Sequence, residues 1–165
     1  VRTIAPCFSS EGARRLASTL GLMAMLGGIP KAWTMQTREW KDAVTAFLED
    51  YVAAFSANDG ARIARLYHAP CVTVRADGSI HSFQSESEIQ SFFQRLADTY
   101  YRDGCRGWKY ENLEVLPLGG RSAVATMDWR MQRQDGSVIR RWKQSYNFVA
   151  IDSRLRILAS TFHLA

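Results

Sequence analysis

The spacing of apolar residues divides the chain into a helical first part and a strand-rich second part. In the stretch MQTREWKDAVTAFLEDYVAAF, apolar side chains recur at steps of three and four residues, which predicts an amphipathic helix over residues 37–57. The segment SANDG ends this helix, and Asp59 is suited to cap a short second helix. That second helix is expected to include Tyr67 and to end before Pro70.

A short hairpin and a third helix follow. Two strands are predicted over residues 71–75 and 79–83, because the Asp77–Gly78 dipeptide between them favours a tight hairpin turn. The next residues, SESE, form a capping box in which Ser85 and Glu88 begin a helix through IQSFFQRLADTYY.

After residue 106 the pattern changes to strands separated by turn signals. These signals lie at residues 119–120, 135–136 and 152–153, and they predict a four-stranded antiparallel meander. Three helices, a hairpin and a meander together predict an α+β fold.

Composition and charge exclude several classes of function. A chain of 165 residues with 47% apolar and 22% charged residues is typical of one folded domain. The net charge of +5 is unevenly placed, since residues 1–34 carry four basic groups and one acidic group, leaving 17 basic against 15 acidic elsewhere. A nearly balanced domain gives no reason to expect a nucleic-acid partner. No apolar run is long enough to predict a membrane span.

The cysteines and histidines show no spacing typical of a metal site, so neither a metal nor another cofactor is expected. They are Cys7, Cys71, Cys105, His68, His81 and His163. A disulfide between Cys71 and Cys105 stays an open alternative.

Residues 1–34 are treated apart from the domain expected at residues 35–165. Two arginines followed by an apolar run are typical of an export signal, but glycines interrupt the run and no clear cleavage site follows. One interpretation is a poorly ordered leader or a mis-assigned start, with a cytoplasmic protein. The alternative is a signal, with an exported protein.

The stretch YVAAFSANDGARIARLY, which begins at Tyr51, resembles the first-helix signature of the nuclear transport factor 2-like superfamily. The order of predicted elements over about residues 38–163 is also similar, especially to the SnoaL-like and ketosteroid-isomerase-like branch. The resemblance implies a cone-shaped α+β barrel, with three N-terminal helices packed on a curved, mostly antiparallel sheet around a pocket. It also implies a homodimer through the outer sheet face, where Val124, Val149 and Leu158 form a modest apolar patch.

The turn dipeptides predict a strand register. A two-residue turn at 135–136 pairs Trp129 with Trp142 and Asp128 with Lys143. A second turn at 152–153 pairs Trp142 with His163, Gln144 with Thr161, and Phe148 with Ile157. One face, expected to be concave and buried, then collects Met127, Trp129, Met131, Trp142, Tyr146, Phe148, Ile157 and His163.

The glycine turn at 119–120 leaves two alternatives for the preceding strand. A two-residue turn places Tyr110, Asn112 and Glu114 on the concave face but leaves Leu113 and Val115 outside. Either a bulge shifts the register midway, or Glu114 is a pocket acid that could act as a general base.

The isomerase chemistry that the resemblance implies is incomplete in this sequence. Tyr51 matches the tyrosine that donates a hydrogen bond to the substrate oxyanion in ketosteroid isomerases. The position of the family's catalytic base falls on Arg75, which cannot accept a proton, and that of the second acid falls near Ser145. Ketosteroid isomerase activity is therefore not expected.

The candidate catalytic residues are Glu114, His163 and Tyr51. The candidate ligand-binding residues are Arg75, Tyr110, Asn112, Met127, Trp129, Trp142, Gln144, Tyr146 and Thr161. Such a set predicts an aromatic-lined pocket for a small, mostly apolar metabolite with a carboxylate or carbonyl facing Arg75. Two functions stay open: acid–base catalysis of the isomerase, dehydratase or cyclase type, or a non-catalytic ligand-binding or dimerisation module.

Overall fold

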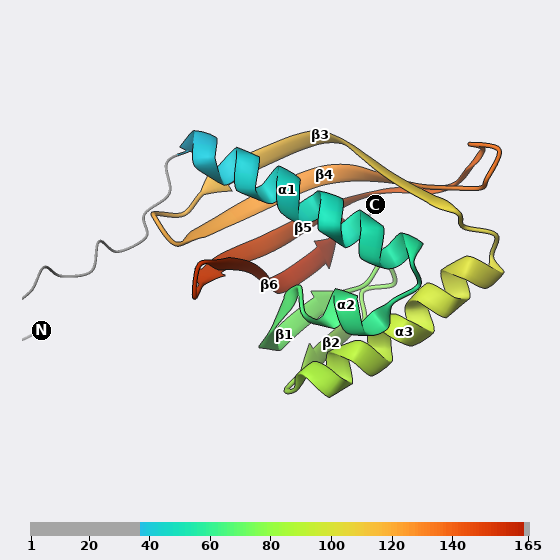
Figure 1. Cartoon of the computed structure of the whole chain (residues 1–165), viewed down its shortest axis with the longest axis horizontal. Helices are drawn as coiled ribbons and strands as arrows, with labels where there is room; N and C mark the ends of the chain where they lie inside the picture. The colour runs from blue at the N-terminus through green and yellow to red at the C-terminus, as the bar shows by residue number, and fades with distance from the viewer. Residues whose placement is uncertain (1–36, 164–165) are drawn as a thin grey trace, which may run out of the picture. The chain divides into compact units, whose positions relative to one another are not determined.

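The computed structural model describes residues 37–163, so the expectations for residues 1–34, including Cys7, fall outside it. Its helices are α1 (Thr37–Ser56), α2 (Gly60–Ala64) and α3 (Glu86–Arg102). Its strands are β1 (Tyr67–Val74), β2 (Ile80–Phe83), β3 (Gly107–Pro117), β4 (Ser122–Gln132), β5 (Val138–Ile151) and β6 (Arg154–Phe162). The predicted sequence of two helices, a hairpin, a third helix and a meander is confirmed (Figure 1).

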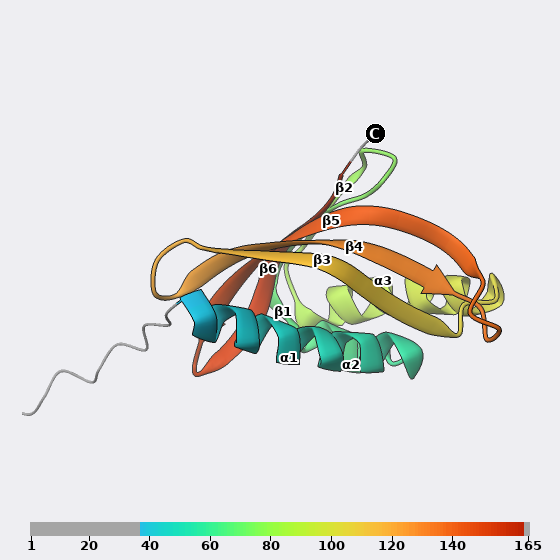
Figure 2. The same ribbon diagram turned by 90° about the horizontal axis from the view of Figure 1, so that it is seen from above.

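The strands of the described residues form one sheet, in the order β2-β1-β6-β5-β4-β3. Neighbouring strands are antiparallel, except β1 and β6, which run parallel. The sheet is strongly curved and the helices lie on its concave side (Figure 2). The α+β class and the curved, mostly antiparallel sheet predicted from the sequence are therefore confirmed.

Helix α1 packs against the sheet with the face that its periodicity predicts. Its buried residues are Trp40, Val44, Phe47, Leu48, Tyr51, Ala54 and Phe55. The Phe47 ring meets the Phe148 ring of β5 edge-on, with centroids 5.0 Å apart. Edge-to-face contact is a favoured arrangement of aromatic rings, because the electropositive edge of one ring meets the electronegative face of the other.

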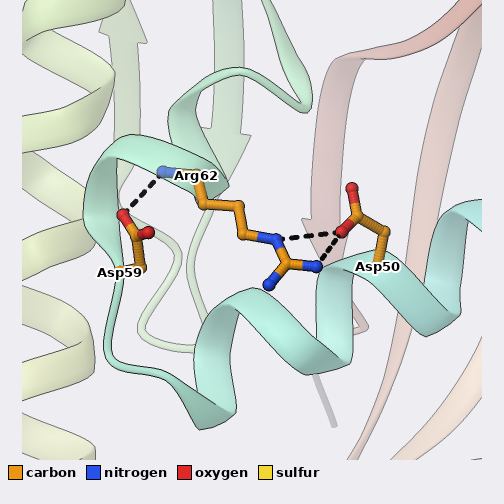
Figure 3. A network of polar contacts seen from close by, with 3 residues as sticks. All are labelled: Asp50, Asp59 and Arg62. Atoms are coloured by element: carbon orange, nitrogen blue, oxygen red, sulfur yellow. Dashed lines mark hydrogen bonds and ion pairs between the residues drawn. The ribbon is translucent and has the colours of Figure 1, made fainter.

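Helix α2 is short and is tied to α1 through charged side chains. Asp59 accepts a hydrogen bond from the backbone N–H of Arg62 (2.8 Å), which confirms the predicted cap. The Arg62 guanidinium pairs with the Asp50 carboxylate of α1 (Figure 3). Because α2 ends at Ala64, the prediction that Tyr67 lies in this helix is wrong, and Tyr67 instead begins β1.

Helix α3 begins at the predicted capping box. The Ser85 hydroxyl accepts a hydrogen bond from the N–H of Glu88 (3.3 Å). The Glu88 carboxylate accepts one in return from the N–H of Gln84 (2.7 Å), one residue earlier than in the standard motif. The first turn of α3 thus has side-chain partners for backbone donors that a helix start leaves free.

The register between β4 and β5 is as predicted. Trp129 pairs with Trp142, and Asp128 with Lys143. The inward positions are strongly buried, since Met127 and Phe148 have no exposed surface and Trp129 is 2% exposed. Next to the turn, however, Gln132 pairs with Val138 rather than with Ile139, so the two-residue turn expected at 135–136 is wrong, and a register shift beside Met131 restores the predicted pairs.

A bulge in the β5–β6 pair overturns part of the predicted register. Phe148 pairs with Ile157 as expected, but the register shifts between Asn147 and Phe148, and Gln144 pairs with Phe162 rather than with Thr161. One extra residue on β6 places the side chains that follow it on the opposite face of the sheet from the one predicted. Phe162 therefore points inward, while Thr161 and His163 are exposed, contrary to the prediction.

A second bulge decides between the two alternatives for β3. The register shifts between Glu111 and Glu114, and Asn112 has a φ of 54°, which asparagine adopts more readily than most residues. Val115 then lies opposite the buried Ala125, whereas Glu114 lies opposite Thr126 and is exposed. The inward orientation considered for Asn112 and Glu114 is therefore wrong.

Candidate functional site

A cavity lies between the helices and the inner face of the sheet. About 410 Å³ of space is unfilled there, counting the part that is open to solvent. Aromatic side chains dominate its walls. It is lined from the helices by Tyr51, Val52, Phe55, Phe93, Leu96 and Tyr100, and from the sheet by Tyr67, Thr73, Trp108, Trp129, Trp142, Gln144, Tyr146, Ser160 and Phe162, with Arg75 just after β1.

Three tyrosines from different elements meet in the deepest part of this wall. The hydroxyl oxygens of Tyr51 and Tyr67 are 3.0 Å apart, and either can donate to the other. The ring of Tyr146 meets that of Tyr51 edge-on, with centroids 5.9 Å apart. All three rings are at least 94% buried, since their exposed fractions are 6%, 3% and 2%.

Burial keeps these phenols neutral. It raises the pKa of Tyr51 to about 12, against an opposing effect of the hydrogen bond with Tyr67. Burial also raises the pKa of Tyr67 and of Tyr146 well above the ordinary value. A neutral phenol donates one hydrogen bond and accepts others, so the cluster offers hydrogen bonds to a ligand but no base.

A series of nearly parallel rings forms another part of the wall. Trp129 and Trp142 stack at 22° with centroids 6.4 Å apart, and Trp142 and Phe162 stack at 14° and 5.6 Å. The Arg75 guanidinium continues the series, 4.8 Å from the Phe162 centroid. The series thus crosses β4, β5 and β6 and ends on a positive charge.

The remaining polar groups of the wall are mostly paired. The hydroxyls of Thr73 and Ser160 are 2.8 Å apart, and the Trp142 indole donates to Gln144 Oε1 (2.9 Å). The exception is Trp129 Nε1, which is buried without a hydrogen-bond partner. It lies near enough to the Tyr146 hydroxyl to lower the pKa of that phenol, but the geometry does not complete a hydrogen bond. An unused buried donor is rare in folded proteins.

The structure brings together six of the residues that the sequence singled out. Tyr51, Arg75, Trp129, Trp142, Gln144 and Tyr146 all line the cavity. Met127 is fully buried beneath it and Tyr110 packs edge-on against Trp129 (5.6 Å), so neither lines it. Four others are on the outer side.

Those four residues are exposed on the outer side of the sheet. Asn112 Nδ2 donates to the Asp128 carboxylate (2.7 Å). His163 Nε2 is 2.7 Å from the Ser145 hydroxyl, and both Glu114 and Thr161 are exposed. The two titratable groups proposed for proton transfer are thus separated from the cavity by the sheet itself.

Sequence reasoning missed several lining residues. Phe162 was missed because the bulge in β6 reversed its orientation, although an aromatic residue between two polar neighbours was a signal for the shift. Tyr67 was missed because it was assigned to a helix. Thr73 and Ser160 are small and polar, and nothing in their local sequence distinguishes them from surface residues.

The described part of the chain gives no support for a metal, disulfide or membrane-spanning function. Within residues 37–163, no group of three or more histidine, cysteine or acidic side chains could hold a metal ion. Cys71 and Cys105 are free and buried, which rules out the bridge between them that the sequence left open. None of the helices here combines the length and apolar character needed to cross a bilayer.

Comparisons with known proteins agree with this architecture. A family model described as NTF2-like protein (DUF6841) matches residues 38–165, while a comparison with curated protein sequences gives no match. An NTF2-like protein with a cystatin-like fold from Novosphingobium aromaticivorans is similar at 14% identity, over 94% of this chain and 92% of that one, with a TM-score of 0.63.

Two further solved structures have the same architecture. A domain of unknown function with a cystatin-like fold from Nostoc punctiforme is similar at 18% identity, over 79% of this chain and 80% of that one, with a TM-score of 0.64. An NTF-2 like protein of unknown function from Shewanella oneidensis is similar at 13% identity, over 74% and 97%, with a TM-score of 0.59. At these identities the likeness shows the fold alone.

Proposed function

The chain belongs to the family of NTF2-like proteins, and from this premise we propose that it binds a small, mostly apolar molecule in the cavity between its helices and the inner face of the sheet. One observation carries the proposal: the cavity is walled by aromatic rings, yet the guanidinium of Arg75 and the paired hydroxyls of Tyr51 and Tyr67 also belong to its wall. Apolar walls with a few polar groups are typical of small-molecule sites.

The proposal favours binding over catalysis. Acid–base chemistry of the SnoaL-like kind needs a group that can accept a proton near neutral pH. Among residues 37–163, none of the side chains that line the cavity is a carboxylate or an imidazole. Tyrosines with raised pKa values and an arginine supply hydrogen bonds and positive charge, but neither takes up a proton at neutral pH.

The narrow shape limits the size of the ligand. Side chains from the helices and from the sheet close around the cavity, so a bound ring has to displace some of them. Val52 and Leu96 are the aliphatic side chains of the wall, and both are partly exposed. Small movements of these two residues would widen the cavity at low cost in buried apolar area.

The test uses the tryptophans as internal reporters. Trp108, Trp129 and Trp142 line the cavity, whereas Trp40 is fully buried in α1 and does not. The indole N–H resonances would be followed by NMR during titration with benzamide and with 2-naphthamide, which are flat and uncharged. Binding in the cavity predicts shifts of the three lining indoles and none for Trp40.

A matched pair of variants ties the shifts to the cavity. Leu96→Phe adds volume to the wall and is expected to weaken binding. Leu118→Phe makes the same change at a side chain that is 51% exposed and does not line the cavity, so it should bind as the original protein does. The proposal is wrong if no flat aromatic probe, neither these amides nor the acids of the same shape, moves the lining indoles, or if Leu96→Phe and Leu118→Phe bind alike.

A further inference from the structure

We propose that the natural ligand of this cavity is a planar aromatic acid whose carboxylate is bound by Arg75. The inference rests on the proposed function and specifies the chemical class of the ligand. Arg75 follows β1 directly and lines the cavity beside Phe162, so its position is defined by the sheet rather than by a long loop.

The surroundings of Arg75 leave its charge without a counter-ion. Within residues 37–163 its guanidinium makes no ion pair. Its neighbours are the rings of Phe162 and Phe92, with centroids 4.8 and 5.9 Å away, and the Tyr100 hydroxyl, to which Nη2 donates at 3.4 Å. The guanidinium stays charged at any physiological pH and has five N–H donors. Most of its donor capacity is therefore free for a ligand.

The acidic side chain near Arg75, that of Asp77, already has hydrogen-bond partners in its own turn. Asp77 is close enough for the positive charge of Arg75 to contribute to its lowered pKa, but the main cause is hydrogen bonding by Ser79. The Asp77 carboxylate accepts from the hydroxyl and the backbone N–H of Ser79, at 2.6 and 2.9 Å, within the hairpin turn. Arg75 therefore lacks a counter-ion among the described residues, and the carboxylate of a ligand would supply one.

Charge and shape together select the ligand class. A guanidinium binds a carboxylate through two parallel hydrogen bonds, and partial burial among rings strengthens them by excluding water. The stack of Trp129, Trp142 and Phe162 leads away from Arg75 and gives an aromatic ring partners for stacked or edge-on contact. A flat ring joined directly to a carboxylate satisfies both features within a narrow space.

The test compares acids with amides of the same shape. Benzoate and benzamide, and 2-naphthoate and 2-naphthamide, would be titrated in pairs while the indole resonances of Trp108, Trp129 and Trp142 are followed. Each acid is expected to bind about tenfold more tightly than its amide, or better, because a charge-assisted bidentate contact replaces a neutral one. Arg75→Gln should remove that preference.

A second arginine is the matched control. Arg140 also lies near Phe162 and Trp142, 5.9 and 5.8 Å from their centroids, but it is exposed and does not line the cavity. Arg140→Gln should keep the preference for acids. Arg75→Lys retains the charge without the bidentate geometry and should give an intermediate preference, which guards against a glutamine variant that folds poorly.

The outcomes separate this inference from the proposed function. If amides bind as tightly as acids, or if Arg140→Gln abolishes the preference and Arg75→Gln does not, the assignment of an acid to Arg75 is wrong while binding in the cavity stands. If neither member of either pair shifts the lining indoles, the proposed function fails, and this inference fails with it.

Discussion

The hydroxyl oxygens of Tyr51 and Tyr67 lie 3.0 Å apart in the interior, one carried by α1 and the other by β1. Each phenol is the hydrogen-bond partner of the other, and both side chains are buried, with exposed fractions of 6% and 3%. The pair therefore joins the first helix to the sheet with a polar contact inside an aromatic core. Tyr51 is thus a structural residue as well as part of the cavity wall.

Replacing Tyr51 with phenylalanine tests that structural role. The change removes one hydroxyl and leaves Tyr67 without this partner, so the free energy of unfolding should fall by about 1–3 kcal/mol. Denaturant unfolding of Tyr51→Phe would measure the loss. Tyr101→Phe is the control, because that side chain is 53% exposed and its hydroxyl makes no hydrogen bond within the described residues. Equal losses in both variants would contradict the prediction.

The raised phenol pKa values predict loss of stability at high pH. A tyrosine whose pKa is higher in the folded than in the unfolded protein favours folding below the unfolded value, 10.0, and this contribution is lost as pH rises through the folded value, about 12 for Tyr51. Up to about 3 kcal/mol would disappear over that range for Tyr51. The free energy of unfolding should therefore fall above pH 10, and less steeply in Tyr51→Phe. An equally steep fall in Tyr51→Phe and in the original protein would contradict this.

Local signals predicted the fold, and two bulges limited the prediction of the site. Helical periodicity and the cap at Asp59 depend on neighbouring residues, and a tight turn such as that at residues 152–153 depends on four residues. The bulge near Asn112 and the one between Asn147 and Phe148 depend on packing across strands. A shift of one residue reverses every side chain beyond it, which is why His163 was expected in the cavity. Glu114 was misplaced because Leu118 bonds to Ser122, one residue further than the predicted two-residue turn allows.

The inward residues of β4 and β5 were placed well, because a register shift beside the turn restores the pairs that a two-residue turn predicts. Trp129 and Trp142 lie within a few pairs of the turn at residues 135–136, and both line the cavity as expected. Arg75 was found through the resemblance of the Tyr51 stretch to a known family rather than through register. Tyr67 was assigned to the wrong element because the residues around the end of α2 are ordinary helix formers, and nothing among them shows that the helix ends at Ala64.

Glu114 and Gln144 provide a contrast between the two faces of the sheet. Glu114 is exposed on the outer face, so Glu114→Gln should change the free energy of unfolding by less than about 0.5 kcal/mol and leave the ligand-induced indole shifts unchanged. Gln144 is 4% exposed and accepts from the Trp142 indole (2.9 Å). Gln144→Leu removes that acceptor and should alter both the Trp142 resonance and binding. NMR titrations of both variants would check this, and a loss of binding in Glu114→Gln would contradict the placement of that residue.

Gly60 marks the closest approach of α2 to α3. A Cβ atom at Gly60 would lie 2.9 Å from the Cα and 2.7 Å from the Cβ of Gln94, so Gly60→Ala requires the backbone of α3 to move. Overpacking of this kind costs about 1–3 kcal/mol, which thermal or denaturant unfolding would detect. Gly107→Ala is the matched control, because the nearest atom to its Cβ would be 3.9 Å away. A Gly60→Ala protein as stable as Gly107→Ala would show that the two helices are less closely packed than described.

The outer face of the sheet is where a second copy of the chain is expected, and this homodimer stays a prediction. The predicted patch of Val124, Val149 and Leu158 is half-buried, and the apolar side chains of Val72 and Ile80 on β1 and β2 are 36% and 70% exposed. Light scattering should give twice the mass of one chain. Val124→Arg would place a charge in the centre of the interface and should give monomers, because an unpaired buried charge opposes association. Leu118→Arg adds the same charge at an exposed turn and should leave the dimer intact. A monomeric original protein would rule out the dimer, and a Val124→Arg protein that still dimerises would assign the interface to another surface.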